Sequence, residues 1–391
     1  MKWNHSQVAL KQGGAEVVII GGSAAGLFAG YLLAREGKHV RLYDANDVLH
    51  TPPRTLIVTS RLEDVLGFHP YGAVVNKIDR FELFSPNRSL TVPMKQPDLV
   101  VERAAIVRML AKKAIQAGVE IRSGCKLLDL EPAEKGVMVT IRNIHRDREE
   151  KFQTRTLIGA DGTFSRVAKI ADCNGYQTTP ILQAIVDLPR DGTANTTRVW
   201  FQPEDTPYFY WMIPESHEKA VVGFITREGK DANAKLKGFL SRRGLKALDI
   251  QAARVPTYTR ATQPWRRISD CDIFLVGDAA GQVKVTTVGG LVTGLRGAKA
   301  AANAILQRVD YRKELRSLRR ELGLHLLIRS ALDQFKSADY DRLLDLLDGN
   351  TLKLLGQYNR DHAVRMIFRL LIAQPRLLRF SPFLSHAIWQ W

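Results

Sequence analysis

The sequence predicts an α/β protein in which a helix-covered parallel sheet is interleaved with an antiparallel sheet and followed by a helical C-terminal region. Three observations predict this fold. The chain opens with a buried strand, a glycine-rich turn and a helix, and two later strands end in an acidic residue beside a glycine. Runs with the two-residue alternation of half-buried strands lie between these segments. The length of 391 residues allows two or three domains.

Composition and charge exclude several classes of protein. Hydrophobic residues make up 45% of the chain and charged residues 25%, which excludes a disordered chain and a fibrous repeat. The three cysteines form no Cys-x-x-Cys pair, so we expect no disulfide framework, no metal site and a cytoplasmic location. The polar N-terminus argues against a signal peptide, and no apolar run reaches the roughly 18 residues of a spanning helix. Any membrane contact is therefore expected to be peripheral, at the inner face.

The net charge of +17 predicts attraction to anionic partners. No helix-turn-helix, zinc or RNA-binding motif accompanies this charge, so we expect no nucleic-acid partner. The C-terminal segment 364–391 concentrates the positive charge, with four arginines, no acidic residue and five Phe or Trp residues. Basic residues interleaved with aromatic residues indicate peripheral contact with an anionic membrane. A C-terminal helix packed against the body of the protein is the alternative.

The first fifty residues contain the elements of a Rossmann-type dinucleotide-binding unit. A buried strand at Glu16–Ile20 is followed by a turn, a helix at Leu27–Gly37 and a second strand that ends at Asp44. The turn is built from small residues, in the order Gly21, Gly22, Ser23, Ala24, Ala25 and Gly26. Small residues let backbone N–H groups approach a pyrophosphate at the helix N-terminus, and a carboxylate at position 44 suits a ribose diol. Ser23 stands where the Gly-x-Gly-x-x-Gly pattern has its middle glycine.

Two later segments repeat the pattern of a strand that ends in an acidic residue beside glycine. Thr156–Lys169 reads TLIGADGTFSRVAK and has Asp161 after its strand. Ile273–Gly294 reads IFLVGDAAGQVKVTTVGGLVTG and has Gly277 and Asp278 in the same place, before a helix at Leu291–Leu306. The carboxyl ends of parallel strands meet at one edge of a sheet, so we expect the three turns to hold one extended ligand.

The three motifs together resemble the flavoproteins of the p-hydroxybenzoate-hydroxylase type and, within them, the geranylgeranyl reductase family. GADGTFSRV is similar to the second fingerprint of that superfamily. GDAAGQVKVTTVGGL is similar to the reductase run GDAAGxVxPxTGGGI, although Val285 replaces its proline and Val288 the first glycine of its triplet. The resemblance implies an FAD-dependent oxidoreductase that binds FAD in an extended form.

The resemblance also implies roles for individual residues at the cofactor. It implies that Asp44 binds the adenosine ribose and that Asp278 binds the ribitol. The backbone of Gly289, Gly290 and Leu291 would face the pyrimidine edge of the flavin, where a helix N-terminus stabilises negative charge. Arg103 would lie near the ribitol and the phosphates, and we expect Arg54 to approach the cofactor as well. The remaining expected cofactor-binding residues are Gly21, Ser23, Ala24, Ala25, Gly26, Asp161 and Gly277.

The segments between the three motifs alternate as strands do. Ile78–Phe84 and Ser89–Met94 read as a hairpin, and four more β-like runs follow at 181–188, 197–202, 208–213 and 220–226. We therefore expect an FAD-binding domain over 1–50, 97–172 and 265–308, and a substrate-binding sheet domain over 51–96 and 173–264. A helical region is expected over 309–391.

One of these runs carries the candidate substrate-binding residues Phe209, Tyr210 and Trp211. The run FYWMIP is similar to the YxWxFP motif of geranylgeranyl reductases and also to the WxWxIP pattern of flavin-dependent halogenases. On a strand, Phe209 and Trp211 share one face, where they could wall an apolar pocket or belong to the core of the sheet.

These features favour an FAD-dependent reductase that saturates C=C bonds of a polyprenyl chain carried by a lipid or quinone. An FAD-dependent monooxygenase or halogenase of an aromatic substrate is the alternative. A third hypothesis is a carrier that binds a prenyl chain and catalyses no reaction. No second dinucleotide fingerprint is present, so electrons would come from transiently docked NAD(P)H or from a donor protein such as reduced ferredoxin, and the charge favours an acidic donor. Many archaeal members of the family carry a cysteine where this chain reads VLHTPPRTLIVTS, so no proton donor is predicted.

Overall fold

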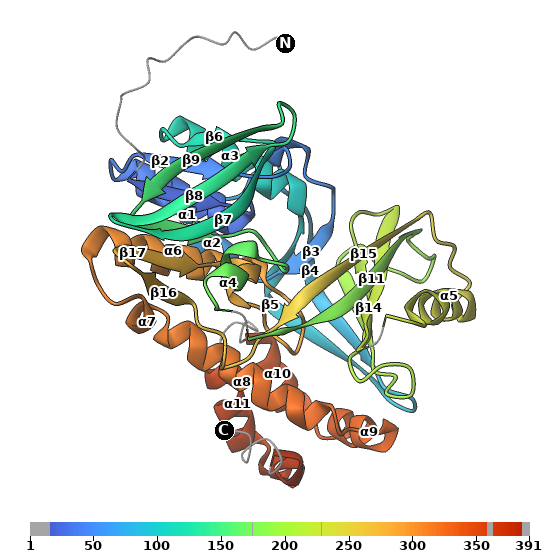
Figure 1. Ribbon diagram of the computed structural model, residues 1–391. Helices are drawn as coiled ribbons and strands as arrows, with labels where there is room; N and C mark the ends of the chain where they lie inside the picture. Colours follow the sequence, from blue (N-terminus) through green and yellow to red (C-terminus); the bar gives the residue numbers. More distant parts are fainter. Residues whose placement is uncertain (1–15, 174, 228, 358–362, 385–391) are drawn as a thin grey trace.

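The computed structural model describes residues 16–173, 175–227, 229–357 and 363–384 and contains three sheets and a C-terminal group of helices (Figure 1). The first sheet has six strands, which are parallel except for the edge strand β16. In spatial order they are β16 (Trp265–Ile268), β17 (Cys271–Leu275), β10 (Thr156–Gly159), β1 (Val17–Ile20), β2 (Val40–Tyr43) and β6 (Glu120–Arg122). This sheet confirms the predicted Rossmann-type core.

Each face of the six-stranded sheet buries alternate residues of β1. Val17 and Ile19 pack with three helices, and Val18 and Ile20 pack with a three-stranded sheet on the other face. The helices are α1 (Ala24–Arg35), α3 (Arg103–Gln116) and α6 (Leu291–Gln307), and the covering strands are β7 (Cys125–Ala133), β8 (Gly136–Asn143) and β9 (Arg148–Thr154). The three-stranded sheet was not predicted from the sequence.

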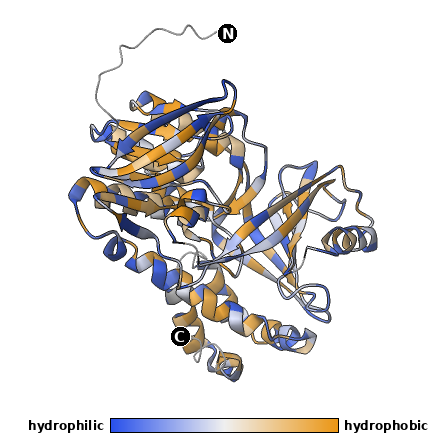
Figure 2. Ribbon diagram, viewed as in Figure 1, coloured by the Kyte–Doolittle hydropathy of each residue, from blue (hydrophilic) through white to orange (hydrophobic). Residues whose placement is uncertain are grey.

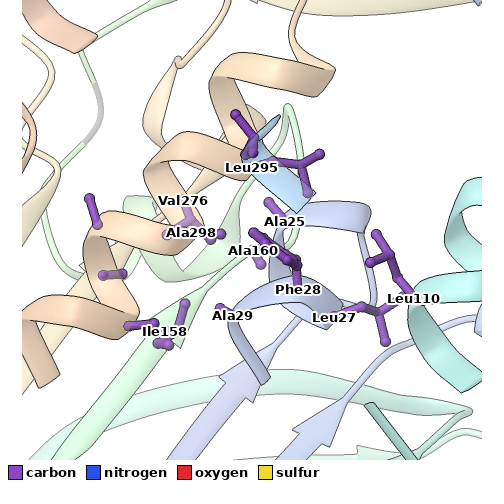
Figure 3. Close-up of a cluster of buried hydrophobic side chains, with 14 of the residues drawn as sticks. Ala25, Leu27, Phe28, Ala29, Leu110, Ile158, Ala160, Val276, Leu295 and Ala298 are labelled. Atoms are coloured by element: carbon purple, nitrogen blue, oxygen red, sulfur yellow. The ribbon is translucent and has the colours of Figure 1, made fainter. Parts of the chain in front are cut away.

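Helix α1 lies at the centre of the helical layer, between α6 and α3 (Figure 3). Its residues Ala25, Phe28 and Ala29 are buried beside Leu295 and Ala298 of α6. The small side chains let α1 and α6 approach closely, so that the N-termini of both helices reach the same edge of the sheet.

The second sheet has eight strands and contains the predicted hairpin and the four further predicted strands. All neighbours are antiparallel except β12 and β4, which are parallel. In spatial order the strands are β15 (Asp249–Thr257), β11 (Gln177–Asp187), β14 (Lys219–Ile225), β13 (Tyr210–Pro214), β12 (Thr196–Trp200), β4 (Val74–Phe84), β5 (Ser89–Glu102) and β3 (Thr55–Val58). Helix α5 (Ala232–Arg242) packs on one face of this sheet.

The predicted boundary at residue 97 falls inside β5. The strand continues to Glu102 because Leu99, Val100 and Val101 are buried and pair with β3 and β4. As a division into domains, the predicted segments stay a prediction.

The C-terminal helices run below both sheets in Figure 1 and confirm the predicted helical region. They are α7 (Tyr311–Glu314), α8 (Arg316–Leu332), α9 (Ser337–Asp345), α10 (Gly349–Gln357) and α11 (Ala363–Ala373), followed by the 3₁₀ turn η4 (Pro375–Phe380). Figure 2 shows hydrophobic residues concentrated in the six-stranded sheet and its helices, and again in α11. None of the described helices has the length and apolar character needed to cross a membrane. Residues 385–391 of the expected membrane segment lie outside the described residues.

Candidate cofactor and substrate sites

The first and second predicted turns are in direct contact. Gly21 follows β1 with φ +109°, and a Cβ atom on it would lie 2.3 Å from the carbonyl carbon of Ala160. A Cβ atom on Gly26 would lie 2.2 Å from the oxygen of Gly21. Both positions therefore exclude any side chain. Ser23 has a local task, because its hydroxyl accepts the Gly26 N–H at 3.3 Å and caps α1.

The third turn meets the first at the N-termini of α1 and α6. A Cβ atom on Gly277 would lie 3.1 Å from Cβ of Ala25, and one on Gly294 would lie 3.0 Å from Cα of Gly277. A Cβ atom on Gly290, which precedes α6, would lie 3.2 Å from Oδ1 of Asp278. The three turns thus converge at the carboxyl edge of the parallel strands.

Asp44 lies at the same edge, at the end of β2. Its Oδ2 accepts the N–H of Gly22 at 2.5 Å, and its Oδ1 accepts the N–H of Asn46 at 2.7 Å. The carboxylate is therefore fixed against the glycine-rich turn.

The carboxylate of Asp161 accepts hydrogen bonds from the start of the short helix α4 (Arg166–Ile170). It accepts the Ser165 hydroxyl at 2.6 Å and the N–H groups of Arg166 and Val167 at 2.7 and 3.1 Å. Burial raises the pKa of Asp161, and these hydrogen bonds act in the opposite direction. Its carboxylate is committed to holding α4.

Asp278 has a different environment, because it faces two arginines. It accepts the Thr163 hydroxyl at 3.3 Å. Burial raises the pKa of the Asp278 carboxyl, whereas the Thr163 hydrogen bond and the charges of Arg103 and Arg54 lower it. The pKa of Arg54 is lowered, first by burial and then by the neighbouring charge of Arg103.

Arg103 and Arg54 are held side by side through their backbones and Glu102. The N–H of Arg103 donates to the oxygen of Arg54 at 2.9 Å, and Glu102 accepts the Arg54 N–H at 3.1 Å. Glu102 also caps α3, which begins at Arg103. The Nε of Arg103 is buried and has no hydrogen-bond partner among the described residues. A buried N–H donor without a partner needs an acceptor.

These features fit FAD. Two adjacent guanidinium groups with an unused buried donor suit phosphate oxygens, and two carboxylates suit ribose and ribitol hydroxyls. The glycines at 21 and 26 let the first turn pack directly on the second, so the N-terminus of α1 lies at the edge where the turns meet and can bind an anionic ligand through its backbone N–H groups. The geometry brings the expected residues of all three motifs together, together with Arg54 and Arg103 from outside them.

A cavity of about 360 Å³ lies between the eight-stranded sheet and the C-terminal helices. One part of its wall is the segment 287–292, which joins the third turn to α6. Phe209 and Trp211 line another part, with ring centroids 6.1 Å apart. Leu355 of α10 and Met366 of α11 complete the wall. The lining is predominantly hydrophobic, which suits an apolar ligand.

Tyr210 does not line this cavity, so the structure gives no support to its predicted contact with substrate. Successive residues of a strand point to opposite faces, so Tyr210 lies on the face opposite Phe209 and Trp211. Its ring stacks on Phe239 of α5 at 4.0 Å and on Phe224 of β14 at 4.8 Å. Tyr210 is therefore a core residue.

The loop that joins the third turn to α6 contains two features that motif analysis did not interpret. Val288, which stands in place of a glycine, adopts a positive φ of 54°. This conformation is strained for a β-branched residue, and Val288 lines the cavity. Lys284 also lines the cavity, and it was missed because the family pattern leaves its position open.

Fold and site together define a flavoprotein of the oxidoreductase class. The profile of the FAD binding domain family matches residues 14–310, so the chain belongs to that family and is an FAD-dependent oxidoreductase. Similar curated proteins are named reductases. Digeranylgeranylglycerophospholipid reductase 2 of Methanothermobacter thermautotrophicus is 25% identical over 393 residues, covering 93% of this chain and 98% of that protein. Digeranylgeranylglycerophospholipid reductase 3 of Methanosphaera stadtmanae is 24% identical over 371 residues, covering 87% and 92%.

Solved structures show the same fold. A geranylgeranyl bacteriochlorophyll reductase-like protein from Thermoplasma acidophilum has a TM-score of 0.77 at 16% identity, covering 95% of this chain and 99% of that one. A triple mutant of a flavin-dependent brominase has a TM-score of 0.67 at 18% identity, covering 93% and 99%. The expected family and FAD cofactor are confirmed, whereas the electron donor stays a prediction.

Proposed function

We propose that this chain reduces C=C bonds in the polyprenyl chain of a geranylgeranyl-type lipid or quinone. The observation that carries the proposal is the apolar cavity, which extends from the third turn, beside Gly289 and Gly290, to Leu355 and Met366. Binding of a hydrocarbon chain in such a cavity is favoured by about 25 cal/mol for each Å² of apolar surface that it removes from water. The names of the curated relatives support the same class of substrate.

We assign the cofactor contacts as follows. The turn at Gly21–Gly26 and the N-terminus of α1 face the pyrophosphate, and Asp44 binds the adenosine ribose. Arg103 and Arg54 neutralise phosphate charge, and Asp278 accepts hydrogen bonds from the ribitol. The residues Gly289, Gly290 and Leu291 present the N-terminus of α6 to the flavin. Asp161 acts through α4 and supports the turn rather than the ligand.

Bound and reduced FAD would supply a hydride, that is one hydrogen nucleus with two electrons, to each C=C bond, and a proton would complete the reduction. The residues of the chain orient the substrate and exclude water. Phe209 and Trp211 press the prenyl chain against the 287–292 segment, so that the double bond lies beside the helix terminus that stabilises negative charge on the cofactor. The largely hydrophobic lining of the cavity favours the prenyl chain over water beside the reacting bond.

A second candidate is an FAD-dependent monooxygenase or halogenase of an aromatic substrate. The structural similarity to a flavin-dependent brominase and the aromatic run on β13 favour it. Oxygen uptake by the reduced holoprotein separates the two candidates. We expect a geranylgeranyl lipid to leave oxygen uptake unchanged and to leave the product free of oxygen and halogen. Aromatic-substrate-stimulated oxygen uptake, with oxygen or halogen in the product, would replace the reductase with the second candidate.

The electron donor is proposed to be NAD(P)H or an acidic protein such as reduced ferredoxin. The net charge of +17 supports transient docking of an anionic donor. Such docking weakens with salt, so the rate of flavin reduction by an acidic donor protein is expected to fall several-fold between low and physiological ionic strength.

We further propose that the protein is cytoplasmic and contacts the inner face of the membrane through α11 and η4. Phe368, Ile372 and Leu378 are 64%, 62% and 56% exposed. Exposed arginines alternate with them at positions 365, 369, 376 and 379. Because Met366 of α11 lines the cavity, this surface adjoins the place where a lipid would enter.

Vesicle sedimentation tests the membrane contact. We expect binding to phosphatidylglycerol vesicles and weak binding to phosphatidylcholine vesicles. The double variant R369E/R376E is expected to lose at least about 30-fold in affinity for the anionic vesicles, at ~1 kcal/mol for each of the two cations removed. The variant K112E, which changes an exposed lysine on α3, is the matched control. Equal binding of both vesicle types would contradict membrane contact by this surface.

A further inference from the structure

Reduction of a C=C bond requires a hydride and a proton, and the cavity offers one strong candidate for the source of the proton. Among the described residues that line the cavity, Lys284 is the only one with an ionisable side chain. The other polar side chains in the lining belong to threonines, to Gln183 and to Trp211. Hydroxyl, amide and indole groups hold their protons too tightly to act as general acids near neutral pH.

The backbone fixes Lys284 at the cofactor end of the cavity. Its N–H donates to the oxygen of Gly289 at 3.1 Å, and its oxygen accepts the Val288 N–H at 2.7 Å. The Cε of Lys284 lies 3.6 Å from the position of a Cβ atom on Gly289. The lysine side chain therefore extends along Gly289, which precedes α6 and borders the cavity.

The loop that carries Lys284 is held to helix α8 by a side-chain hydrogen bond. Thr286 and His325 of α8 are joined by a hydrogen bond of 2.7 Å between Oγ1 and Nδ1. Lys284 itself is only 9% exposed, so little bulk water reaches it. A general acid needs such a fixed position, because proton transfer depends on short distances to the reacting carbon.

We propose that Lys284 is the catalytic residue that donates the proton to the substrate carbon. The inference rests on the proposed reductase function. In each step the π bond breaks and two C–H bonds form. One carbon receives a hydrogen with two electrons from reduced FAD, which becomes oxidised, and the other carbon receives a proton from the Lys284 ammonium. The neutral amine then recovers a proton from solvent.

Three substitutions separate proton donation from a purely electrostatic role. K284M keeps an unbranched side chain but has no proton to give. K284R keeps the positive charge, but a guanidinium does not lose its proton in proteins. K284A leaves space in which added methylammonium can supply the proton. K299M, on the exposed side of α6, is the control for loss of one positive charge.

The test uses the holoprotein with a geranylgeranyl glycerophospholipid and counts saturated bonds by mass spectrometry. We expect K284M and K284R to lose at least about 100-fold in turnover, K299M to match the parent, and methylammonium to restore K284A at least tenfold. FAD content, flavin reduction potential and lipid affinity are expected to stay at parental values in K284M.

Parental turnover in K284M overturns the inference alone, and so does parental turnover in K284R, since positive charge would then suffice. A change in FAD content or in flavin reduction potential in K284M would also overturn it, because Lys284 would then serve the cofactor. If the parent protein binds the lipid and saturates none of its bonds, the proposed function fails and the inference fails with it.

Discussion

Asp161 and Asp278 occupy equivalent positions in the sequence but have different hydrogen-bond partners in the structure. Each follows a strand of the six-stranded sheet and stands beside a glycine. Asp161 accepts three hydrogen bonds from the chain, all at the start of α4. Asp278 accepts one, from Thr163, and faces Arg54 and Arg103.

The difference separates a structural carboxylate from a binding carboxylate. A carboxylate whose acceptor sites are filled by its own backbone stabilises a turn. A carboxylate with spare acceptor sites, held between cations in a converging set of turns, is suited to a ligand. A motif shared by both residues cannot make this distinction, because it records neighbours in sequence and not hydrogen-bond partners.

The largest effect is expected on stability, from D161A. The substitution leaves two N–H groups of α4 and the Ser165 hydroxyl without their acceptor, at a cost of about 3 kcal/mol in the free energy of unfolding. Urea unfolding of the cofactor-free protein measures it. FAD affinity of the folded variant is expected to change less than about threefold. Parental stability with lost FAD binding would reverse the roles of the two residues.

D278A is expected to act on the cofactor instead. Loss of a hydrogen-bonding carboxylate costs about 2 kcal/mol in binding, which raises the Kd for FAD about 30-fold. Titration of the cofactor-free protein with FAD, followed by flavin fluorescence, gives the Kd. The unfolding free energy without FAD is expected not to fall. A variant that retains FAD with the parental Kd would show that Asp278 does not contact the cofactor.

Arg103 sharpens the comparison, because it is one of the cations that distinguish the surroundings of Asp278. R103M removes the guanidinium whose Nε is buried and is expected to raise the Kd for FAD about tenfold, or about 1.4 kcal/mol. K112M removes an exposed positive charge from the same helix and serves as the control. Equal effects of both variants would indicate long-range charge rather than a direct contact.

The smallest predicted effect concerns pH. Burial raises the pKa of Asp278 above its unfolded value near 3.9, although Arg54 and Arg103 oppose the shift. The folded, cofactor-free protein therefore holds this proton more tightly than the unfolded chain, so stability is lost as pH rises through the raised pKa. D278N cannot ionise, and we expect it to exceed the parent by about 1 kcal/mol at pH 7 and to match it near pH 3. A D278N protein that is less stable at pH 7 would contradict this.

The elements that a local motif or a regular hydrophobic pattern marks were predictable from the sequence. The glycines at 21 and 26 mark a turn that no side chain can enter, and the strands around them follow from short buried runs. Both the parallel sheet and the hairpin at 78–94 follow from local pattern. These features depend on neighbours in sequence, which is why the sequence alone predicts them.

Features that depend on distant partners were not predictable. The strands β7–β9 were missed because their pattern does not show that they cover the second face of the parallel sheet. Tyr210 was assigned to substrate because its motif does not indicate which strand face meets α5. Leu355 and Met366 reach the cavity through the packing of α10 and α11, and no motif marks them.

Mass spectrometry of the lipid product tests the central claim most directly. Purified holoprotein, reduced under anaerobic conditions, is incubated with a glycerophospholipid that carries geranylgeranyl chains. We expect products that are heavier by two hydrogens for each saturated bond, with one oxidised flavin formed for each bond. An unchanged lipid in the presence of reduced, bound flavin would contradict the account.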